Sequence, residues 1–284
     1  MSIWSFFKGN SQHNHKSNYD ELTPELKIEI KNLLQSDKAK DFNTEYIRTT
    51  NLEKKIITQY GFEAIKLIYE RSNSSNYFQL GEFPKESPWF YLNNHNVEGF
   101  IKTNFKSILK NIPDLIDAMI TRCQFIYAEK KEDCWQLHYL LDMKLYDNRE
   151  YFKIYTGRAP ILNPSPNTNL ANFKWNIPED LKTFYTIHDG FGDIYGANYI
   201  MSNAEIKIMA ELMNPISKEN NTNPEGYEFS DLLEFFPDGS GNAQCFYKNN
   251  SNATVDWDHE TWEISGETKF FHFINERMGE IDEE

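Results

Sequence analysis

Residues 231–264 read DLLEFFPDGSGNAQCFYKNNSNATVDWDHETWEI. Short runs of aromatic and branched residues alternate in this stretch with a Gly-Ser-Gly turn and an Asn-rich loop, a pattern typical of antiparallel strands joined by tight turns. The same stretch holds an acidic cluster at Asp256, Asp258 and Glu260. Because clustered carboxylates repel one another unless a positive charge faces them, the cluster indicates a metal site, a catalytic site or a docking surface.

The residues just before this stretch predict two helices. Residues 177–188 carry an apolar stripe at helical spacing and are followed by Gly190, which suits the left-handed end of a helix. Ser202 and Glu205 have the spacing of a capping box and predict a second helix over 202–213. Helices followed by an antiparallel meander indicate the α+β class, with helices packed on the sheet.

The first half of the chain has a different pattern. Apolar spacing predicts mainly helical structure there, with aromatic and branched residues that could also pair as strands near its end. Helices are expected over about 23–34, 51–71, 100–109 and 113–128, and strands over 134–146 and 149–157, the first of these two being ambiguous with a helix.

A proline-rich segment, residues 159–169, separates the two patterns, because its three prolines oppose regular helix. We therefore predict a mainly helical N-terminal region at 1–165 and a second domain at 166–284. The charge changes at the same place. Residues 1–169 carry 22 basic and 21 acidic residues, whereas residues 170–284 carry 7 and 22, a net charge of −15. Such a domain repels phosphates, so we expect no nucleic acid as a partner and favour a basic protein.

The bulk sequence excludes several classes of protein. The chain has no run of 18 apolar residues, so no membrane span is expected, and its first residues lack the pattern of a signal peptide. Three widely spaced cysteines without a Cys-x-x-Cys pair indicate free thiols in a reducing compartment. These features predict a cytoplasmic protein.

Asp256, Asp258 and His259 are candidate metal ligands by residue type. If they continue a strand, the two aspartates face one side of the sheet and His259 faces the other. Two carboxylates without a third convergent ligand make a weak metal site. A docking surface is therefore the favoured interpretation, and we predict no metal and no cofactor.

Three further motifs resemble catalytic ones without completing them. The His-Asn-His triplet at 13–15 lacks the spread over strand, loop and helix that a metal-dependent nuclease centre needs. The Gly-Ser-Gly segment at 239–241 lacks the Lys-Ser/Thr of a phosphate-binding loop. His188 and Asp189 are neighbours at a helix end, and no Ser or Cys is placed as their nucleophile. We therefore predict that the chain is not an enzyme.

Four segments of the C-terminal third form an ordered set: IPEDLKTFYTIHDGFG at 177–192, YIMSNAEI at 199–206, PDGSGNAQCFY at 237–247 and VDWDHETWEI at 255–264. In this order and spacing they resemble the SUKH superfamily, which includes the yeast Smi/Knr regulators and many bacterial immunity proteins. The chain departs from the family pattern before Ile177, where FKWN replaces the usual acidic helix. The resemblance covers about residues 170–276 and implies a non-enzymatic α+β domain, of a kind whose bacterial members bind and neutralise a toxin, commonly a nuclease.

The resemblance and the charge together predict an immunity protein that binds a basic toxin of a polymorphic toxin system and occludes it. Two alternatives stay open: a non-enzymatic scaffold or regulatory module inside the cell, and an enzyme with carboxylates as metal ligands. The predicted partner-binding residues are Asp189, Asp193, Asp238, Asp256, Asp258 and Glu260.

Overall fold

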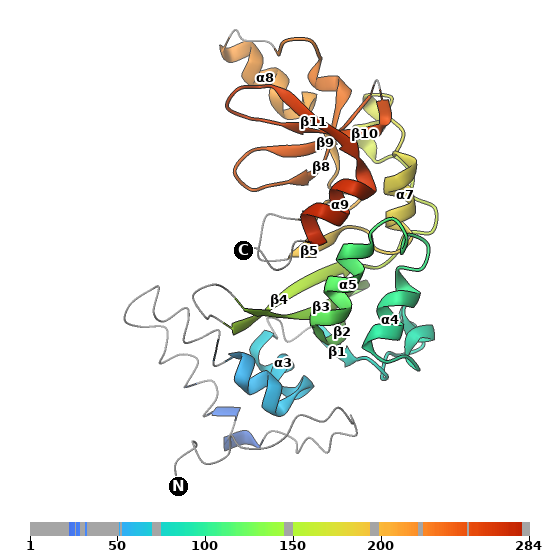
Figure 1. Ribbon diagram of the computed structural model, residues 1–284, viewed down its shortest axis with the longest axis vertical. Helices are drawn as coiled ribbons and strands as arrows, with labels where there is room; N and C mark the ends of the chain where they lie inside the picture. Colours follow the sequence, from blue (N-terminus) through green and yellow to red (C-terminus); the bar gives the residue numbers. More distant parts are fainter. Residues whose placement is uncertain are drawn as a thin grey trace.

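The computed structural model describes most of the chain after residue 50 (Figure 1). The described residues are 23–25, 27–28, 32, 51, 53–69, 75–144, 150–193, 199–220, 224–248 and 250–279. The nuclease-like triplet at 13–15 and most of the helix predicted over 23–34 lie outside them. None of the described helices is long and apolar enough to cross a membrane.

Two antiparallel sheets organise the molecule. Sheet A has the strand order β1-β2-β3-β4-β5-β6: β1 (Ser75–Gln79), β2 (Cys123–Lys131), β3 (Cys134–Lys144), β4 (Glu150–Arg158), β5 (Phe191–Asp193) and β6 (Tyr199–Ile200). Sheet B has the order β11-β10-β9-β8-β7: β7 (Lys207–Ile208), β8 (Leu232–Pro237), β9 (Ala243–Tyr247), β10 (Asn250–Trp257) and β11 (Ile264–Lys269). The helices that accompany these sheets confirm the predicted α+β class.

The helices cover the faces of the two sheets and lie between them (Figure 1). They are α3 (Phe62–Tyr69), α4 (Val97–Asn104), α5 (Pro113–Arg122), α6 (Thr168–Asn172), α7 (Glu179–Tyr185), α8 (Ala210–Asn220) and α9 (Phe270–Gly279), with 3₁₀ turns η2 (Phe90–Leu92) and η3 (Phe229–Asp231). Helix α3 and the helical residues 53–60 bury one face of sheet A, and α4 and α5 bury the other. Helix α9 lies beside α5, where Asn275 Oδ1 accepts a hydrogen bond of 2.8 Å from the Asp114 amide.

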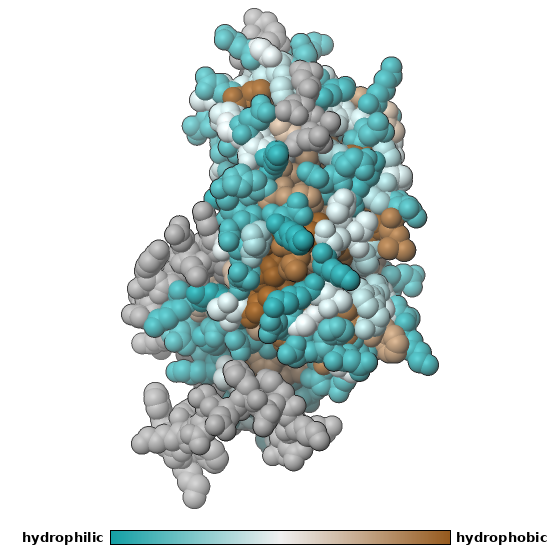
Figure 2. All heavy atoms as spheres, turned by 45° about the vertical axis from the view of Figure 1, so that its right-hand side comes forward, coloured by the Kyte–Doolittle hydropathy of each residue, from teal (hydrophilic) through white to brown (hydrophobic). Residues whose placement is uncertain are grey.

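The main hydrophobic core continues through both sheets. Phe270, at the start of α9, is fully buried and its ring lies 6.1 Å from that of Phe184 on α7. The same ring is 5.3 Å from Phe235 on β8 and 5.4 Å from Phe246 on β9. On the face drawn in Figure 2, hydrophilic side chains predominate and hydrophobic ones are confined to small areas.

The mainly helical prediction for residues 1–165 is corrected in the described part of that region, where β1 to β4 form most of sheet A. The helix predicted over 113–128 ends at Arg122, and strand β2 begins at the next residue. Residues 123–128 also have helical apolar spacing, but they form a strand because β2 pairs antiparallel with β3 along its length. The predicted strands over 134–146 and 149–157 are confirmed as β3 and β4, which pair antiparallel.

The proline-rich segment 159–169 joins strands of one sheet. Strand β4 precedes it, β5 follows it, and the two pair with Tyr155 opposite Asp193. Within the segment, the Ile161 amide donates to the Tyr185 carbonyl at 2.8 Å. The predicted domain limit at 165/166 thus falls inside a connection between two strands of sheet A.

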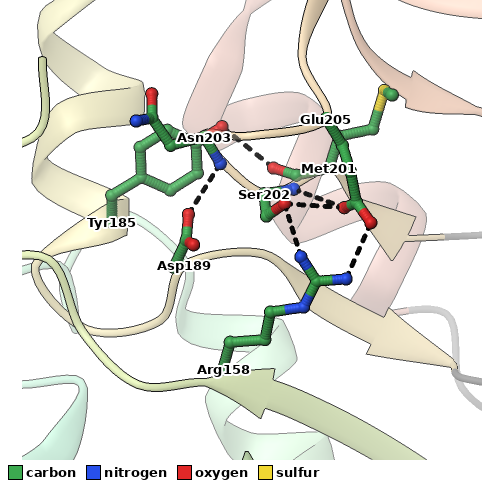
Figure 3. A network of polar contacts seen from close by, with 7 residues as sticks. All are labelled: Arg158, Tyr185, Asp189, Met201, Ser202, Asn203 and Glu205. Atoms are coloured by element: carbon green, nitrogen blue, oxygen red, sulfur yellow. Dashed lines mark hydrogen bonds and ion pairs between the residues drawn. The ribbon is translucent and has the colours of Figure 1, made fainter. Parts of the chain in front are cut away.

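The predicted helix over 177–188 is confirmed as α7, but the capping box at Ser202 does not open a helix. Glu205 Oε2 accepts hydrogen bonds from the Ser202 amide and hydroxyl, at 3.0 and 2.8 Å. The first bond is half of a capping box, but the Glu205 amide donates to the Ser202 carbonyl and not to its hydroxyl. The other carboxylate oxygen of Glu205 binds Arg158 of sheet A at 2.7 Å, so the segment is held across the sheet end (Figure 3). The chain then enters β7, and α8 begins at Ala210.

The same segment connects the two sheets. Tyr185 donates its hydroxyl hydrogen to the Met201 carbonyl at 2.9 Å (Figure 3). The Met201 amide in turn donates to the Phe235 carbonyl of sheet B at 2.8 Å. These bonds fix the relative position of sheets A and B.

A buried histidine lies in the core beside sheet A. His188 is fully buried, with Nε2 3.0 Å from the Tyr139 hydroxyl and 3.1 Å from Asn104 Nδ2. Its ring is seated against Gly157 of β4, where the Cβ of any other residue would overlap it. Burial lowers the pKa of His188 to about 3, although its contact with the Arg158 carbonyl opposes the shift.

We expect the folded state to lose stability as the pH falls from about 6.5 towards 3. Over that window the unfolded chain protonates His188 and the folded chain does not, so the added proton favours unfolding. Urea unfolding at a series of pH values measures the effect. In the variant His188→Gln, which keeps a neutral polar side chain, the free energy of unfolding should fall less steeply as the pH is lowered. Equal slopes of the free energy of unfolding against pH in the two proteins would contradict a lowered pKa of His188 in the folded state.

Candidate functional site

Two acidic loops meet at one end of sheet B. Residues 238–242 connect β8 to β9, and residues 258–263 connect β10 to β11; we call them the loop pair. Asn242 Oδ1 accepts a hydrogen bond of 3.0 Å from the His259 amide and lies 2.9 Å from His259 Nδ1. Gly241 has φ +112°, and a Cβ there would lie 2.9 Å from the His259 ring. The loops are therefore held against each other by close, specific contacts.

Each loop begins with an aspartate that binds its own turn. Asp238 accepts from the Ser240 amide at 2.8 Å and from its hydroxyl at 2.7 Å. Asp258 accepts from the Glu260 and Thr261 amides, both at 2.8 Å. Partial desolvation acts to raise the pKa of Asp238, but the bonds from Ser240 and Asn242 lower it. The amide bonds from Thr261 and Glu260 are the main cause that lowers the pKa of Asp258, and the Thr261 hydroxyl and the His259 charge lower it further. Both carboxylates are thus held in place in the ionised form.

The variant Asp258→Ala should loosen the second loop. It removes the acceptor of two backbone amides, whereas Asp258→Asn keeps an oxygen at that position. Hydrogen exchange of the Glu260 and Thr261 amides should accelerate roughly tenfold in the alanine variant, as the loss of a hydrogen bond implies, and much less in the asparagine variant. Unchanged exchange in Asp258→Ala would show that other contacts hold this loop.

An acidic cleft of about 330 Å³ opens beside the loop pair, between sheet B and α9. Asp256 lies opposite Gln244 on the paired strands β10 and β9, so their side chains share the face that α9 covers. Burial raises the pKa of Asp256, and the charge of Arg277 opposes the shift. Polar residues of the wall are Asp238, Asn242, Gln244, Asp256, Asp258, Ser265 and Arg277, and aromatic ones are Phe236, Trp257 and Phe273.

The structure brings together four of the six predicted partner-binding residues. Asp238, Asp256 and Asp258 line the cleft, and Glu260 is exposed on the loop pair. The other two lie near the end of sheet A that Arg158 occupies. Asp189 accepts a hydrogen bond of 2.6 Å from the Asn203 amide (Figure 3), and Asp193 lines a separate hollow of about 310 Å³.

The strand argument about His259 needs a correction. Strand β10 ends at Trp257, so Asp258 and His259 lie in a turn and strand alternation does not place them. His259 faces Asn242 instead. Among the described residues, no three His, Cys, Asp or Glu side chains lie close enough to hold a metal ion. Trp257 is 3% exposed and donates its indole N–H to the Tyr227 hydroxyl at 2.9 Å, so this side chain belongs to the core.

An apolar groove that the sequence did not reveal lies on the other side of sheet B. It has a volume of about 590 Å³, runs along α8, and shares Asn242 and Trp257 with the acidic cleft. Leu212 and Ile216, one helical turn apart, are 51% and 36% exposed at its edge. Met209, Leu212, Met213 and Ile216 follow one another at helical spacing. This apolar stripe in the sequence could have indicated that part of α8 has an exposed apolar face.

The end of sheet B therefore offers fixed negative charge, hydrogen-bond acceptors and adjoining apolar surface. This combination suits the binding of a positively charged protein surface better than bond-making chemistry. Comparisons of the chain with protein-family models, with curated proteins and with solved structures found no match.

Proposed function

We propose that this chain is an immunity protein that binds a basic bacterial toxin and neutralises it by covering part of its surface. The observation that carries the proposal is the gathering of Asp238, Asp256, Asp258 and Glu260 at one end of sheet B. The four carboxylates come from two segments of the sequence, because Asp238 begins one loop and the other three lie within residues 256–260, and both loops are held by their own hydrogen bonds. Such a surface needs little reordering when a partner binds.

The charge around this surface supports a cationic partner. Residues 225–263 contain nine acidic residues and one basic residue, Lys248. Negative charge of this density accelerates the approach of a basic protein and disfavours acidic ones. The adjoining groove, with Leu212 and Ile216 at its edge, supplies apolar area that the charges alone lack. The resemblance of four segments to the SUKH superfamily supports an immunity role over that of a general scaffold.

The proposal is tested by co-expression with the product of the adjacent gene in the native genome. Immunity genes protect only against their own toxins, so expression of the neighbouring toxin domain should stop growth and the full chain should restore it. A toxin domain from an unrelated system serves as the control and should stay lethal. If the neighbour is harmless, or if the chain gives no protection against it, the chain is not its immunity protein, and a scaffold or regulatory role becomes the better account.

A further inference from the structure

The acidic cleft contains one polar group that the protein itself does not satisfy. Gln244 is 3% exposed and lines the cleft, yet its Oε1 has no hydrogen-bond partner among the described residues. A buried carbonyl oxygen without a donor costs free energy and is uncommon in folded proteins. Its position opposite Asp256 indicates that a donor belongs in this cleft.

The hydrogen bonds around Gln244 indicate which end of its amide is unpaired. Its Nε2 donates to the Thr254 hydroxyl oxygen at 3.0 Å, and that hydroxyl is directed toward the Thr268 carbonyl at 3.4 Å. In this arrangement the amide nitrogen is the donor and the buried oxygen is the atom without a partner. The missing partner is a donor.

The carboxylate of Asp256 is the second acceptor in the cleft. It is seated against Gly266 of β11, which has φ +62° and whose missing Cβ would overlap the carboxylate. Arg277 of α9 acts on Asp256 through its charge, but the two side chains form no salt bridge in the described part of the chain. Asp256 thus keeps acceptor capacity for a further positive group.

The chemistry of the cleft selects among cations. A metal ion needs several ligands at one point, and the carboxylates here do not converge in that way. A guanidinium has five N–H donors spread over a plane and reaches acceptors that lie apart. Phe236 and Phe273 pack edge to face on each other, with ring centroids 5.1 Å apart, and form one apolar side of the cleft against which a planar cation can lie. An ammonium group, as a compact point charge, matches spread acceptors less well.

We propose that the cleft is a receptor for an arginine side chain of the partner, whose guanidinium binds Asp256 and the Gln244 carbonyl beside the aromatic side of the cleft. This inference rests on the proposed function, since it names the group that the toxin inserts. Asp238 and Asp258, held at the cleft rim by their own turns, add negative charge at the mouth.

The test uses the full chain and a capped arginine, N-acetyl-arginine methylamide, followed by NMR. Saturable shifts are expected at the Gln244 side-chain amide and at the Asp256 and Gly266 backbone amides, with a Kd of roughly millimolar order for a ligand of this size. The capped citrulline has the same shape without the charge and should not bind. Asp256→Asn should weaken arginine binding roughly tenfold, as loss of a charged hydrogen bond implies.

Glu225→Gln is the matched control, because it removes one exposed negative charge from the acidic segment 225–263 at a residue outside the cleft wall and the loop pair. It should change the Kd less than about twofold. Arg277→Gln removes the positive charge from the cleft wall and should tighten the binding of capped arginine. This second variant tests the cleft independently if Asp256→Asn does not fold.

Equal effects of Asp256→Asn and Glu225→Gln would overturn the inference, because they would reduce the site to general charge attraction. Equal binding of capped citrulline or capped lysine, or tighter binding of Mg²⁺ or Ca²⁺ at the same residues, would also overturn it. If the arginine probe fails while growth protection persists, the cleft assignment falls and the immunity function stands. If arginine binds but the chain gives no protection against the neighbouring toxin, the cleft assignment stands and the immunity function falls.

Discussion

The triple variant Asp256→Asn, Asp258→Asn, Glu260→Gln should bind the basic partner about 10- to 100-fold more weakly than the unchanged chain, mainly through a slower association rate. Each change removes one negative charge and keeps the size and an acceptor oxygen of the side chain. The turn that Asp258 organises should therefore survive. Surface plasmon resonance at low and at physiological salt measures the rates, and the difference between the proteins should shrink as salt increases.

A matched control separates a local effect from a change in net charge. The variant Glu82→Gln, Glu86→Gln, Asp117→Asn also removes three negative charges, at exposed positions between β1 and the end of α5. It should leave the Kd within about twofold. If the two triple variants weaken binding equally, the loop pair has no special role and the overall charge is sufficient.

Phe270→Ala should lower the free energy of unfolding by about 3–5 kcal/mol. The ring is fully buried and contacts aromatic rings from α7, β8 and β9, so its removal leaves a cavity where the helices meet sheet B. A loss of this size is a large fraction of the stability of a typical domain. Urea unfolding followed by both fluorescence and circular dichroism measures it.

Phe90→Ala makes the same chemical change at a ring that is 42% exposed, and it should cost much less. Because the core continues through both sheets, we expect the two probes to give one coincident transition in the unchanged chain. A Phe270→Ala variant as stable as Phe90→Ala would contradict the placement of α9 against sheet B.

Local sequence signals predicted the parts of the fold that local interactions decide. The meander of residues 231–264 and helix α7 follow directly from apolar spacing and turn residues. Sequence spacing failed where distant contacts decide the conformation. Strand β2 replaces the end of a predicted helix because it pairs along β3. Residues 203–205 form a turn and not the start of a helix, and Glu205 there is held by Arg158 of sheet A.

The site was predicted in composition but not in geometry. The acidic residues of the meander were visible in the sequence, and their excess charge already indicated a cationic partner. The approach of Asp238 to Asp258 depends on the register of β9 against β10, and the unpaired oxygen of Gln244 depends on the bond of its nitrogen to Thr254. The pairing of β4 with β5 across the proline-rich connector could not be read from the sequence, because it joins residues far apart along the chain.

The most direct test of the central claim is a hydrogen-exchange footprint of the full chain with and without the toxin domain encoded by the adjacent gene. If the loop pair and the acidic cleft form the interface, amides of residues 238–242 and 256–263 should become protected in the complex. Segments of sheet A far from this end should exchange as in the free chain. Protection confined to residues 75–144, with residues 238–263 unchanged, would contradict the account.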